Sequence, residues 1–281
     1  RFYAGRFTSL LDGFRGRFGR SIIGGFRALQ DEGYIEIATS CATHGYLPLF
    51  ERDSSIYAQV RTGVRTYERH FGRKPESFWL PECAYRQGFV AGDGTRKPGI
   101  EEFLASNGLK VFFTETHMIL GGTPVGKAAG DAFGPYPEIS KRYTVPLAQY
   151  EEPSERTTFQ PYWVSSPEVA AMGRNRETGL QVWSADHGYP GDFNYREFHR
   201  KDGESGLHYW RVTGAGVDLG EKSLWDPAAG FGRTEAHAEH FAALVEREVA
   251  QYRDRTGRYG IVCAAYDTEL FGHWWFEGVT W

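Results

Sequence analysis

Residues 77–88 read SFWLPECAYRQG and combine the end of an apolar strand with a carboxylate. The run at 78–80 is typical of a buried strand, and Pro81 ends the hydrogen-bond ladder because it has no N–H to donate. Glu82 follows where the strand opens into a loop. A carboxylate behind three apolar residues costs free energy unless it has a partner or a chemical role. The stretch therefore indicates either a Glu82 paired with an arginine or an active-site carboxylate.

A second stretch, residues 260–278, repeats this pattern and reads GIVCAAYDTELFGHWWFEG. Its apolar run at 261–265 has the length of a buried strand, and Asp267 and Glu269 follow where the run ends. A histidine and two tryptophans come directly after them. Cleavage of a glycosidic bond uses two carboxylates on opposite sides of the bond, and aromatic faces suit sugar rings. Together the two stretches indicate a site that acts on sugars.

Three motifs carry a resemblance to a known enzyme family. The signature regions of glycoside hydrolase family 57 are similar to WLPECAY at 79–85, AYDTELFGHWW at 265–275 and IEIATSCATHGYLPLF at 35–50. Within the family, the chain resembles the 1,4-α-glucan branching enzymes most. The family's His-Gln-Pro segment on the first barrel strand, and the helical region after the barrel, have no counterpart here. The chain therefore resembles an internal fragment of a longer enzyme.

The resemblance implies an α/β fold, namely a distorted parallel (β/α)7-type barrel that is incomplete in this chain. Residues 1–281 would form this partial catalytic barrel, with a long insertion loop around 115–166. The residues themselves favour a parallel sheet, because strand-like runs alternate with helical patterns. In such barrels the site lies at the carboxyl ends of the strands, where we expect Glu82 and Asp267.

Apolar periodicity predicts the individual elements. We expect helices at 1–30, 53–71, from Pro98 to Asn107 and at 233–256, and strands at 34–42, 77–80, 109–114, 261–265 and up to Trp183. The first helix carries arginines beside its apolar positions. That pattern indicates a solvated face over a packed face, and a basic surface for a membrane or a nucleic acid is the alternative.

The resemblance gives a role to each candidate residue. Glu82 would be the nucleophile of a retaining reaction and Asp267 the general acid and base, with their carboxyl groups about 5–5.5 Å apart. Asp267 then needs a raised pKa, which burial or the charge of Glu82 would supply. Glu269 competes for the acid role, although strand alternation points it away from Asp267. Substrate binding is expected from His44 and His273 on sugar hydroxyls, and from Trp183 and Trp274 on ring faces.

The long loop and the segment after Trp183 hold further aromatic candidates. By resemblance, a tyrosine at the tip of the loop approaches the site, and Tyr136, Tyr150 and Tyr162 are the candidates. A polar and aromatic segment suited to a glucan groove follows, with Tyr195, Phe198, His208, Tyr209 and Trp210.

Composition limits the possible partners and the compartment. The net charge of −4 gives no overall bias towards nucleic acid or membrane, whereas 16% aromatic residues favour stacking surfaces. Cys41, Cys83 and Cys263 have no paired spacing, which favours reduced thiols and a cytoplasmic protein. Cys41 and His44 alone do not make a zinc site, so neither a metal nor a cofactor is expected. We expect an α-1,4-glucan as the partner and a monomeric protein.

Several functions remain open from the sequence. The leading one is a 1,4-α-glucan branching enzyme, in which the 6-hydroxyl of a glucan takes up the transferred chain instead of water. An α-amylase or a 4-α-glucanotransferase of the same family is the second. A non-catalytic glucan-binding fragment is the third, because a missing barrel strand leaves an open sheet edge. A metal-dependent deacetylase on a similar barrel is the most distant alternative.

Overall fold

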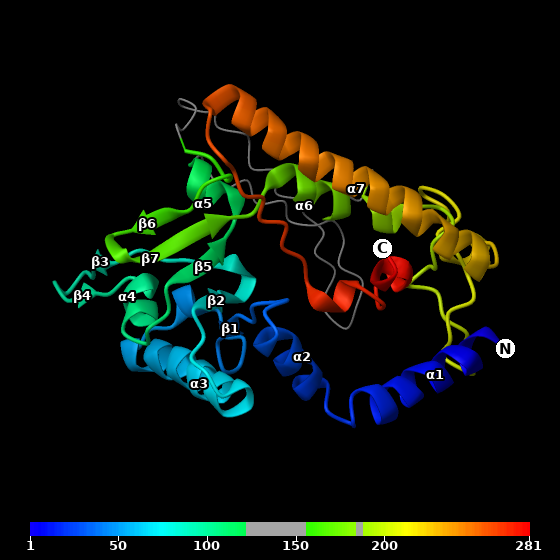
Figure 1. Ribbon diagram of the computed structural model, residues 1–281, viewed down its shortest axis with the longest axis horizontal. Coiled ribbons are helices and arrows are strands. Elements are labelled where there is room, and N and C mark those ends of the chain that lie inside the picture. Colours follow the sequence, from blue (N-terminus) through cyan, green and yellow to red (C-terminus); the bar gives the residue numbers. More distant parts are fainter. Residues whose placement is uncertain (122–155, 184–187) are drawn as a thin grey trace.

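The computed structural model describes residues 1–121, 156–183 and 188–281. A mostly parallel sheet with its helices occupies one end of the molecule (Figure 1). The long helix α7 (Pro227–Thr256) and the N-terminal helix α1 (Phe2–Asp12) extend away from it, and the C-terminal residues lie between them. The molecule therefore has one end that holds the sheet and another that is formed by α1, α7 and the C-terminal residues.

The sheet has the strand order β1-β2-β5-β7-β6. Its strands are β1 (Thr39–Ser40), β2 (Ser77–Trp79), β5 (Val111–Thr114), β7 (Ser166–Gly173) and β6 (Tyr162–Val164). All neighbours are parallel except β6, which pairs antiparallel with β7. The predicted parallel α/β sheet is confirmed, and β1 is an edge strand within the described residues. A separate hairpin joins β3 (Phe89–Val90) to β4 (Arg96–Lys97).

Helices α3 (Asp53–Phe71), α4 (Ile100–Ala105) and α5 (Thr116–Leu120) pack beside the sheet. The predicted bounds of α3 are confirmed. Helix α4 begins two residues after Pro98, so the prediction that this proline opens the helix is wrong. The buried side chains of α3 and α4 join those of the strands in the main core, which includes Ile56, Val60, Phe78, Leu80, Ile100, Leu104 and Phe112. Gly63 lets α3 approach β1 closely, since a Cβ there would lie 1.9 Å from the Ser40 carbonyl oxygen.

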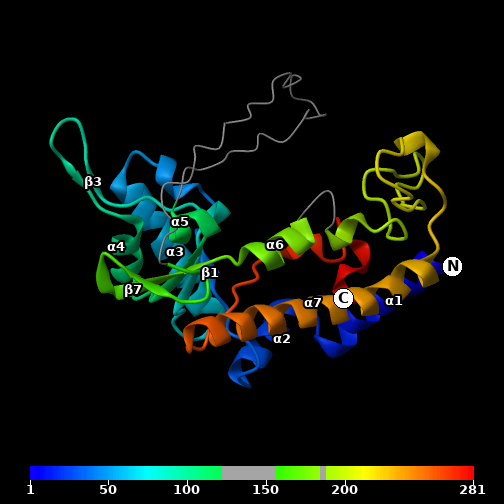
Figure 2. The ribbon, with the colours of Figure 1, turned by 90° about the horizontal axis from the view of Figure 1, so that it is seen from above.

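Two predicted strands have a different structure. The run that ends at Trp183 is the helix α6 (Arg176–Trp183), which follows β7 and leads the chain away from the sheet (Figure 2). Residues 261–265 are extended, but within the described part of the chain they form no ladder with any strand of the sheet. Instead, Ile261 N–H donates to the Phe159 carbonyl at 3.0 Å and the Cys263 carbonyl accepts from Asn175 N–H at 2.8 Å. Short apolar runs do not distinguish these outcomes.

An aromatic cluster forms a second core between α6, α7 and the C-terminal residues. Its buried members are Val182, Tyr189, Tyr195, Leu270 and Trp275. Tyr195 is fully buried, so its predicted place in a glucan groove is wrong. Much of the high aromatic content therefore stabilises the fold. Helix α7 begins at Pro227, earlier than predicted, because the Asp226 carboxylate caps it and proline suits the first turn.

The N-terminal region forms two helices instead of one. Helix α1 continues into a π-helical turn (Gly13–Arg17), and α2 (Ile22–Asp31) starts where the Ser21 hydroxyl accepts from Gly24 N–H at 3.0 Å. The expected packed face is wrong for most of these residues. Their exposed side chains form an N-terminal apolar stripe, made of Phe7, Leu10, Leu11, Phe14, Phe18, Ile22, Ile23, Phe26 and Leu29. Among the described helices, none has the length and apolar character to cross a membrane.

Candidate active site

Glu82 stands directly after strand β2, in the short 3-10 turn Pro81–Cys83. Glu82 and Cys83 both have left-handed backbone angles, with φ of 56° and 53°. Each such residue costs about 1–2 kcal/mol unless it is glycine, so the surrounding contacts must hold the turn. Cys83 N–H donates to the Leu80 carbonyl at 2.9 Å, and the Thr114 hydroxyl donates to the Cys83 carbonyl at 3.2 Å. The turn thus presents the Glu82 carboxylate beyond the strand end.

His44 lies against Glu82. The two strands that precede them, β1 and β2, are parallel neighbours, so their carboxyl ends meet. His44 Nε2 is 3.2 Å from Glu82 Oε1, and the side chains of His44 and Glu82 are 57% and 70% exposed. His44 also has a left-handed backbone, with φ of 53°. The structure therefore brings together the predicted sugar-binding histidine and the predicted nucleophile on an open face.

Asp267 is placed by three anchors between its own segment and the start of α6. The Cys263 carbonyl accepts from Asn175 N–H at 2.8 Å, and the Ala265 carbonyl accepts from the Arg174 guanidinium at 2.8 Å. The Tyr266 hydroxyl donates to the Thr178 carbonyl at 2.8 Å. Hydrogen bonds with residues after β7 thus hold residues 263–266 in place of a strand ladder with the described sheet. They hold the end of the extended segment at the sheet's carboxyl edge.

The pKa of Asp267 is raised above its ordinary value. Loss of water around the carboxyl group is the largest cause, and the negative charge of Glu269 comes next. Arg174 opposes this rise in the pKa, Glu82 adds to it, and His44 opposes it. Glu82 and His44 therefore lie close enough to Asp267 for their charges to act on it. A raised pKa keeps more of the carboxyl group protonated, which suits a general acid.

The sequence reasoning missed an ion pair beside Asp267. Glu115 follows β5, Arg174 follows β7, and Arg174 Nη1 lies 2.7 Å from Glu115 Oε1. The sequence could have indicated both positions, because each is a charged residue that follows an apolar run, as Glu82 does. The pair fixes the guanidinium that also bonds the Ala265 carbonyl. Arg174 consequently joins the strand ends to the Asp267 segment.

Asp267, Glu115 and Arg174 line a cavity of about 470 Å³ together with Trp183 and Trp274. The two indole rings meet edge to face, with centroids 6.2 Å apart and planes at 78°. Trp274 is 43% exposed. The structure thus brings both predicted stacking residues to the wall of the cavity that holds Asp267.

His273 lies beside this wall. Its ring is stacked with that of Trp274 at 6.5 Å, and its backbone carbonyl accepts from the Arg196 guanidinium at 3.4 Å. Glu269, the competing acid, acts on Asp267 through its charge and is exposed.

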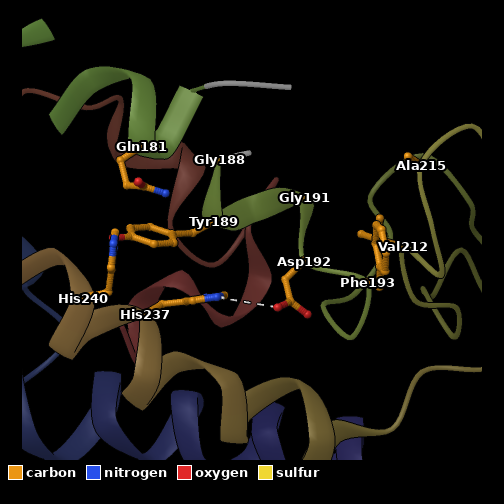
Figure 3. Close-up of a pocket in the computed structure, with 10 residues that line it drawn as sticks. All are labelled: Gln181, Gly188, Tyr189, Gly191, Asp192, Phe193, Val212, Ala215, His237 and His240. Atoms are coloured by element: carbon orange, nitrogen blue, oxygen red, sulfur yellow. Dashed lines mark hydrogen bonds and ion pairs between the residues drawn. The ribbon is translucent and has the colours of Figure 1, made fainter. Parts of the chain in front are cut away.

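A separate cavity of about 530 Å³ lies between the turn Tyr189–Gly191 and α7 (Figure 3). His237 Nε2 lies 3.6 Å from Asp192 Oδ2, and the Tyr189 hydroxyl is 2.6 Å from His240 Nδ1. The ring of His237 is stacked on that of Tyr189 at 4.8 Å. None of the predicted site residues lines this cavity, and its polar groups bond one another. These contacts hold the turn against α7.

The predicted loop tyrosines have different outcomes. Tyr136 and Tyr150 lie outside the described residues. Tyr162 belongs to β6, and its hydroxyl accepts from Thr157 N–H at 2.8 Å. It is therefore part of the sheet and not at the tip of a loop, so its candidacy is wrong. Within the described ranges, no group of three or more His, Cys, Asp or Glu side chains is arranged to hold a metal ion.

Comparison with known proteins gives consistent matches. A model of glycosyl hydrolase family 57 matches residues 6–274. A curated 1,4-alpha-glucan branching enzyme of Thermococcus kodakarensis is 50% identical over 264 residues, covering 92% of this chain and 36% of that protein. A probable 1,4-alpha-glucan branching enzyme of Mycobacterium tuberculosis is 30% identical over 273 residues, covering 96% and 43%. The chain thus spans less than half the length of these curated relatives.

Solved structures match over nearly the whole chain. The branching enzyme of Thermococcus kodakaraensis has a TM-score of 0.82 at 48% identity and covers 98% of this chain and 47% of its own. That of Pyrococcus horikoshii has a TM-score of 0.83 at 44% identity, with 100% and 47% covered. The α-amylase AmyC of Thermotoga maritima has a TM-score of 0.74 at 31% identity, with 99% and 50% covered.

Proposed function

Because this chain belongs to glycosyl hydrolase family 57, we propose that its protein is a 1,4-α-glucan branching enzyme. The observation that supports this most is the high identity to a branching enzyme, 50% over 92% of the chain. The similar α-amylase is only 31% identical over a comparable span, so branching is favoured over hydrolysis. The substrate would be an α-1,4-glucan, and the products would be α-1,6 branches in a glycogen-type glucan.

The proposed reaction retains the configuration at the anomeric carbon. Glu82 attacks C1 of the donor glucose, and Asp267 protonates the oxygen of the bond that breaks. The position of Glu82 beyond β2 and the raised pKa of Asp267 support these two roles. His44, which contacts Glu82, would bind hydroxyl groups of the same sugar and orient the carboxylate.

The second step distinguishes branching from hydrolysis. A glucan 6-hydroxyl gives its proton to the Asp267 carboxylate and attacks C1, and the ester bond to Glu82 breaks. Transfer to a sugar requires that water is excluded from the intermediate. Trp183 and Trp274, on the wall of the Asp267 cavity, would bind sugar rings there and displace water. Tyr136 and Tyr150 stay candidates for covering the site.

Compartment and assembly are part of the proposal. Cys41, Cys83 and Cys263 are free and buried, and burial raises the pKa of Cys41 and Cys83 to about 12. Reduced, unreactive thiols support a cytoplasmic protein, as a role in glycogen synthesis requires. The expected monomer stays a prediction.

Proton NMR of amylose incubated with the protein at its natural length tests the function. We expect a new α-1,6 anomeric signal, and we expect Glu82→Gln to lose it by at least about a thousandfold because the ester cannot form. The conservative change keeps the size of the side chain and one acceptor oxygen, and it replaces the other oxygen by an amide group. Reducing ends without α-1,6 signal would instead assign the protein to hydrolysis. Unchanged branching by Glu82→Gln would exclude Glu82 as the nucleophile.

A further inference from the structure

A second cavity adjoins the one that holds Asp267. It has a volume of about 470 Å³ and shares the walls formed by Trp183 and Trp274. Its far side is formed by Arg196, Glu197, Phe198 and His199. Gly191 and Val212, labelled in Figure 3, separate it from the cavity beside α7. The tryptophan pair is thus the boundary between two neighbouring cavities and belongs to both.

Aromatic rings run from the Asp267 cavity into this second one. Trp183 meets Trp274 at 6.2 Å, and Trp274 meets Phe198 at 6.2 Å with planes at 63°. Phe198 is itself fixed by His273, whose ring lies edge to face with it at 4.9 Å, and by stacking on His208 at 6.0 Å. Aromatic rings in a row, each held by contacts with its neighbours, offer successive apolar faces to a chain of sugar rings.

Polar groups border the same rings. The buried Glu197 carboxylate lies 3.0 Å from His199 Nδ1 and 3.3 Å from Lys222 Nζ, and these contacts lower its pKa despite burial. The His199 side chain is 74% exposed. Because Nδ1 faces Glu197, Nε2 lies on the opposite edge of the imidazole ring. A fixed histidine beside an aromatic face can bond the hydroxyl edge of a sugar whose ring face packs on Phe198.

The position relative to Asp267 indicates which part of the glucan would bind. In a retaining reaction one carboxyl group serves first as acid and then as base, and it contacts the glycosidic oxygen. The sugars beyond that oxygen therefore lie on the same side of the site as this carboxyl group. The first cavity is lined by Asp267, and Glu82 is not among its lining residues. The first cavity therefore lies beside the proposed acid and base, where leaving-group and acceptor sugars would bind, and the second cavity continues it beyond Trp183 and Trp274.

We propose that the cavity bounded by Trp274, Phe198 and His199 is the binding site of the acceptor glucan. The proposal rests on the proposed branching function and adds the residues that hold the acceptor. With the acceptor chain packed on Phe198 and bonded by His199, its 6-hydroxyl is delivered past Trp274 to Asp267. The hydroxyl proton passes to Asp267, the C1–O6 bond forms, and the ester bond to Glu82 breaks.

The test separates donor cleavage from acceptor binding, in the protein at its natural length. Maltoheptaosyl fluoride is the donor, because its leaving group is a fluoride ion that needs no sugar-binding site. Amylose is the added acceptor. Fluoride release reports formation of the intermediate, and α-1,6 signal reports transfer.

We expect His199→Ala to keep fluoride release without acceptor and to raise the amylose concentration for half-maximal transfer roughly fivefold. Phe198→Ala should raise it roughly tenfold.

Phe89→Ala is the matched control, since Phe89 is an exposed phenylalanine that lines a different cavity. It should leave the dependence on amylose unchanged. Unchanged dependence in both His199→Ala and Phe198→Ala would overturn the acceptor site while leaving the branching function intact. In His199→Ala the backbone N–H of residue 199 and Lys222 still hold the Glu197 carboxylate, so we expect that variant to fold even where Phe198→Ala does not. No fluoride release from the unsubstituted protein would overturn the branching function and the acceptor site together.

Discussion

After the loss of water around the carboxyl group, the charge of Glu269 is the next cause that raises the pKa of Asp267, and Glu269 does not line the cavity of Asp267. Its negative charge disfavours ionisation of Asp267, which raises the pKa of Asp267, and the positive charge of Arg174 acts in the opposite direction. The proposed first step needs protonated Asp267, so we expect the basic limb of the pH–rate profile to follow this pKa. We therefore expect Glu269, the competitor for the acid role, to tune the pKa of Asp267.

Replacing Glu269 tests this arrangement. Glu269→Gln removes a negative charge, so the pKa of Asp267 should fall and the basic limb should move to lower pH. The measurement is kcat/KM for amylose across the pH range, because the leaving oxygen of a glucan needs the proton of Asp267. Glu204→Gln, which removes an exposed carboxylate from a distant loop, should leave the limb in place. A shift to higher pH in Glu269→Gln, or loss of all activity, would contradict the tuning role.

Residues of the site differ in how well the sequence predicted them. His44, Glu82, Asp267 and Trp274 stand in the three motifs, and Trp183 ends an apolar run. The structure brings His44 and Glu82 to neighbouring strand ends, and Asp267, Trp183 and Trp274 to one cavity. The ion pair between Glu115 and Arg174 joins residues far apart in the chain, and no local pattern links them. The buried Glu197 and its partner Lys222 were missed for the same reason.

At the scale of elements, the periodicity of apolar residues predicted the helices and strands whose formation depends on neighbouring residues in the chain. Helix α3 and strand β2 have apolar patterns with clear ends, and both are confirmed. The run before Trp183 is too short to tell helix from strand, and it forms α6. Residues 261–265 are strand-like in sequence but form no ladder with the described strands, because pairing depends on which strand lies alongside. Strand pairing is set by the whole sheet, so a local sequence pattern does not predict it.

The contact between α3 and β1 predicts a sharp contrast between two glycines. In Gly63→Ala the new Cβ meets the Ser40 carbonyl oxygen at 1.9 Å, so the helix must shift. We expect the free energy of unfolding to fall by about 2 kcal/mol. Gly232→Ala, on an exposed face of α7 with nothing within 4 Å, should instead raise it by roughly 0.5–1 kcal/mol.

Urea unfolding followed by tryptophan fluorescence measures both variants. Equal effects of the two substitutions would show that α3 does not depend on this close approach. The result also bears on the site, because β1 leads to His44. A shifted α3 should therefore reduce activity in Gly63→Ala and leave it unchanged in Gly232→Ala.

At the scale of the whole molecule, the N-terminal apolar stripe governs how the chain behaves by itself. Leu10 is 57% exposed and Phe26 is 50% exposed, and their neighbours along α1 and α2 are similar. Contiguous apolar surface of this kind is typical of a face that another surface covers. We therefore expect residues 1–281 alone to associate as their concentration rises, whereas the monomer stays the prediction for the protein at its natural length.

Sedimentation velocity over a concentration series checks this expectation. The double variant Leu10→Lys and Phe26→Lys should sediment as a monomer where the parent chain associates. The double variant Leu49→Lys and Leu224→Lys alters two leucines that are more exposed but stand outside the stripe. It should associate as the parent does. A parent chain that stays monomeric at every concentration would refute the role of the stripe.

The left-handed turn at Glu82 and Cys83 has a consequence for how this protein can evolve. Both residues occupy backbone angles that glycine and asparagine adopt more easily, and under the proposed function selection for catalysis would hold the turn in this less stable form. A duplicated gene released from that selection should accumulate glycine or asparagine at these two positions early. Such a descendant would gain robustness from the same mutations that end its chemistry, and so would not easily regain it.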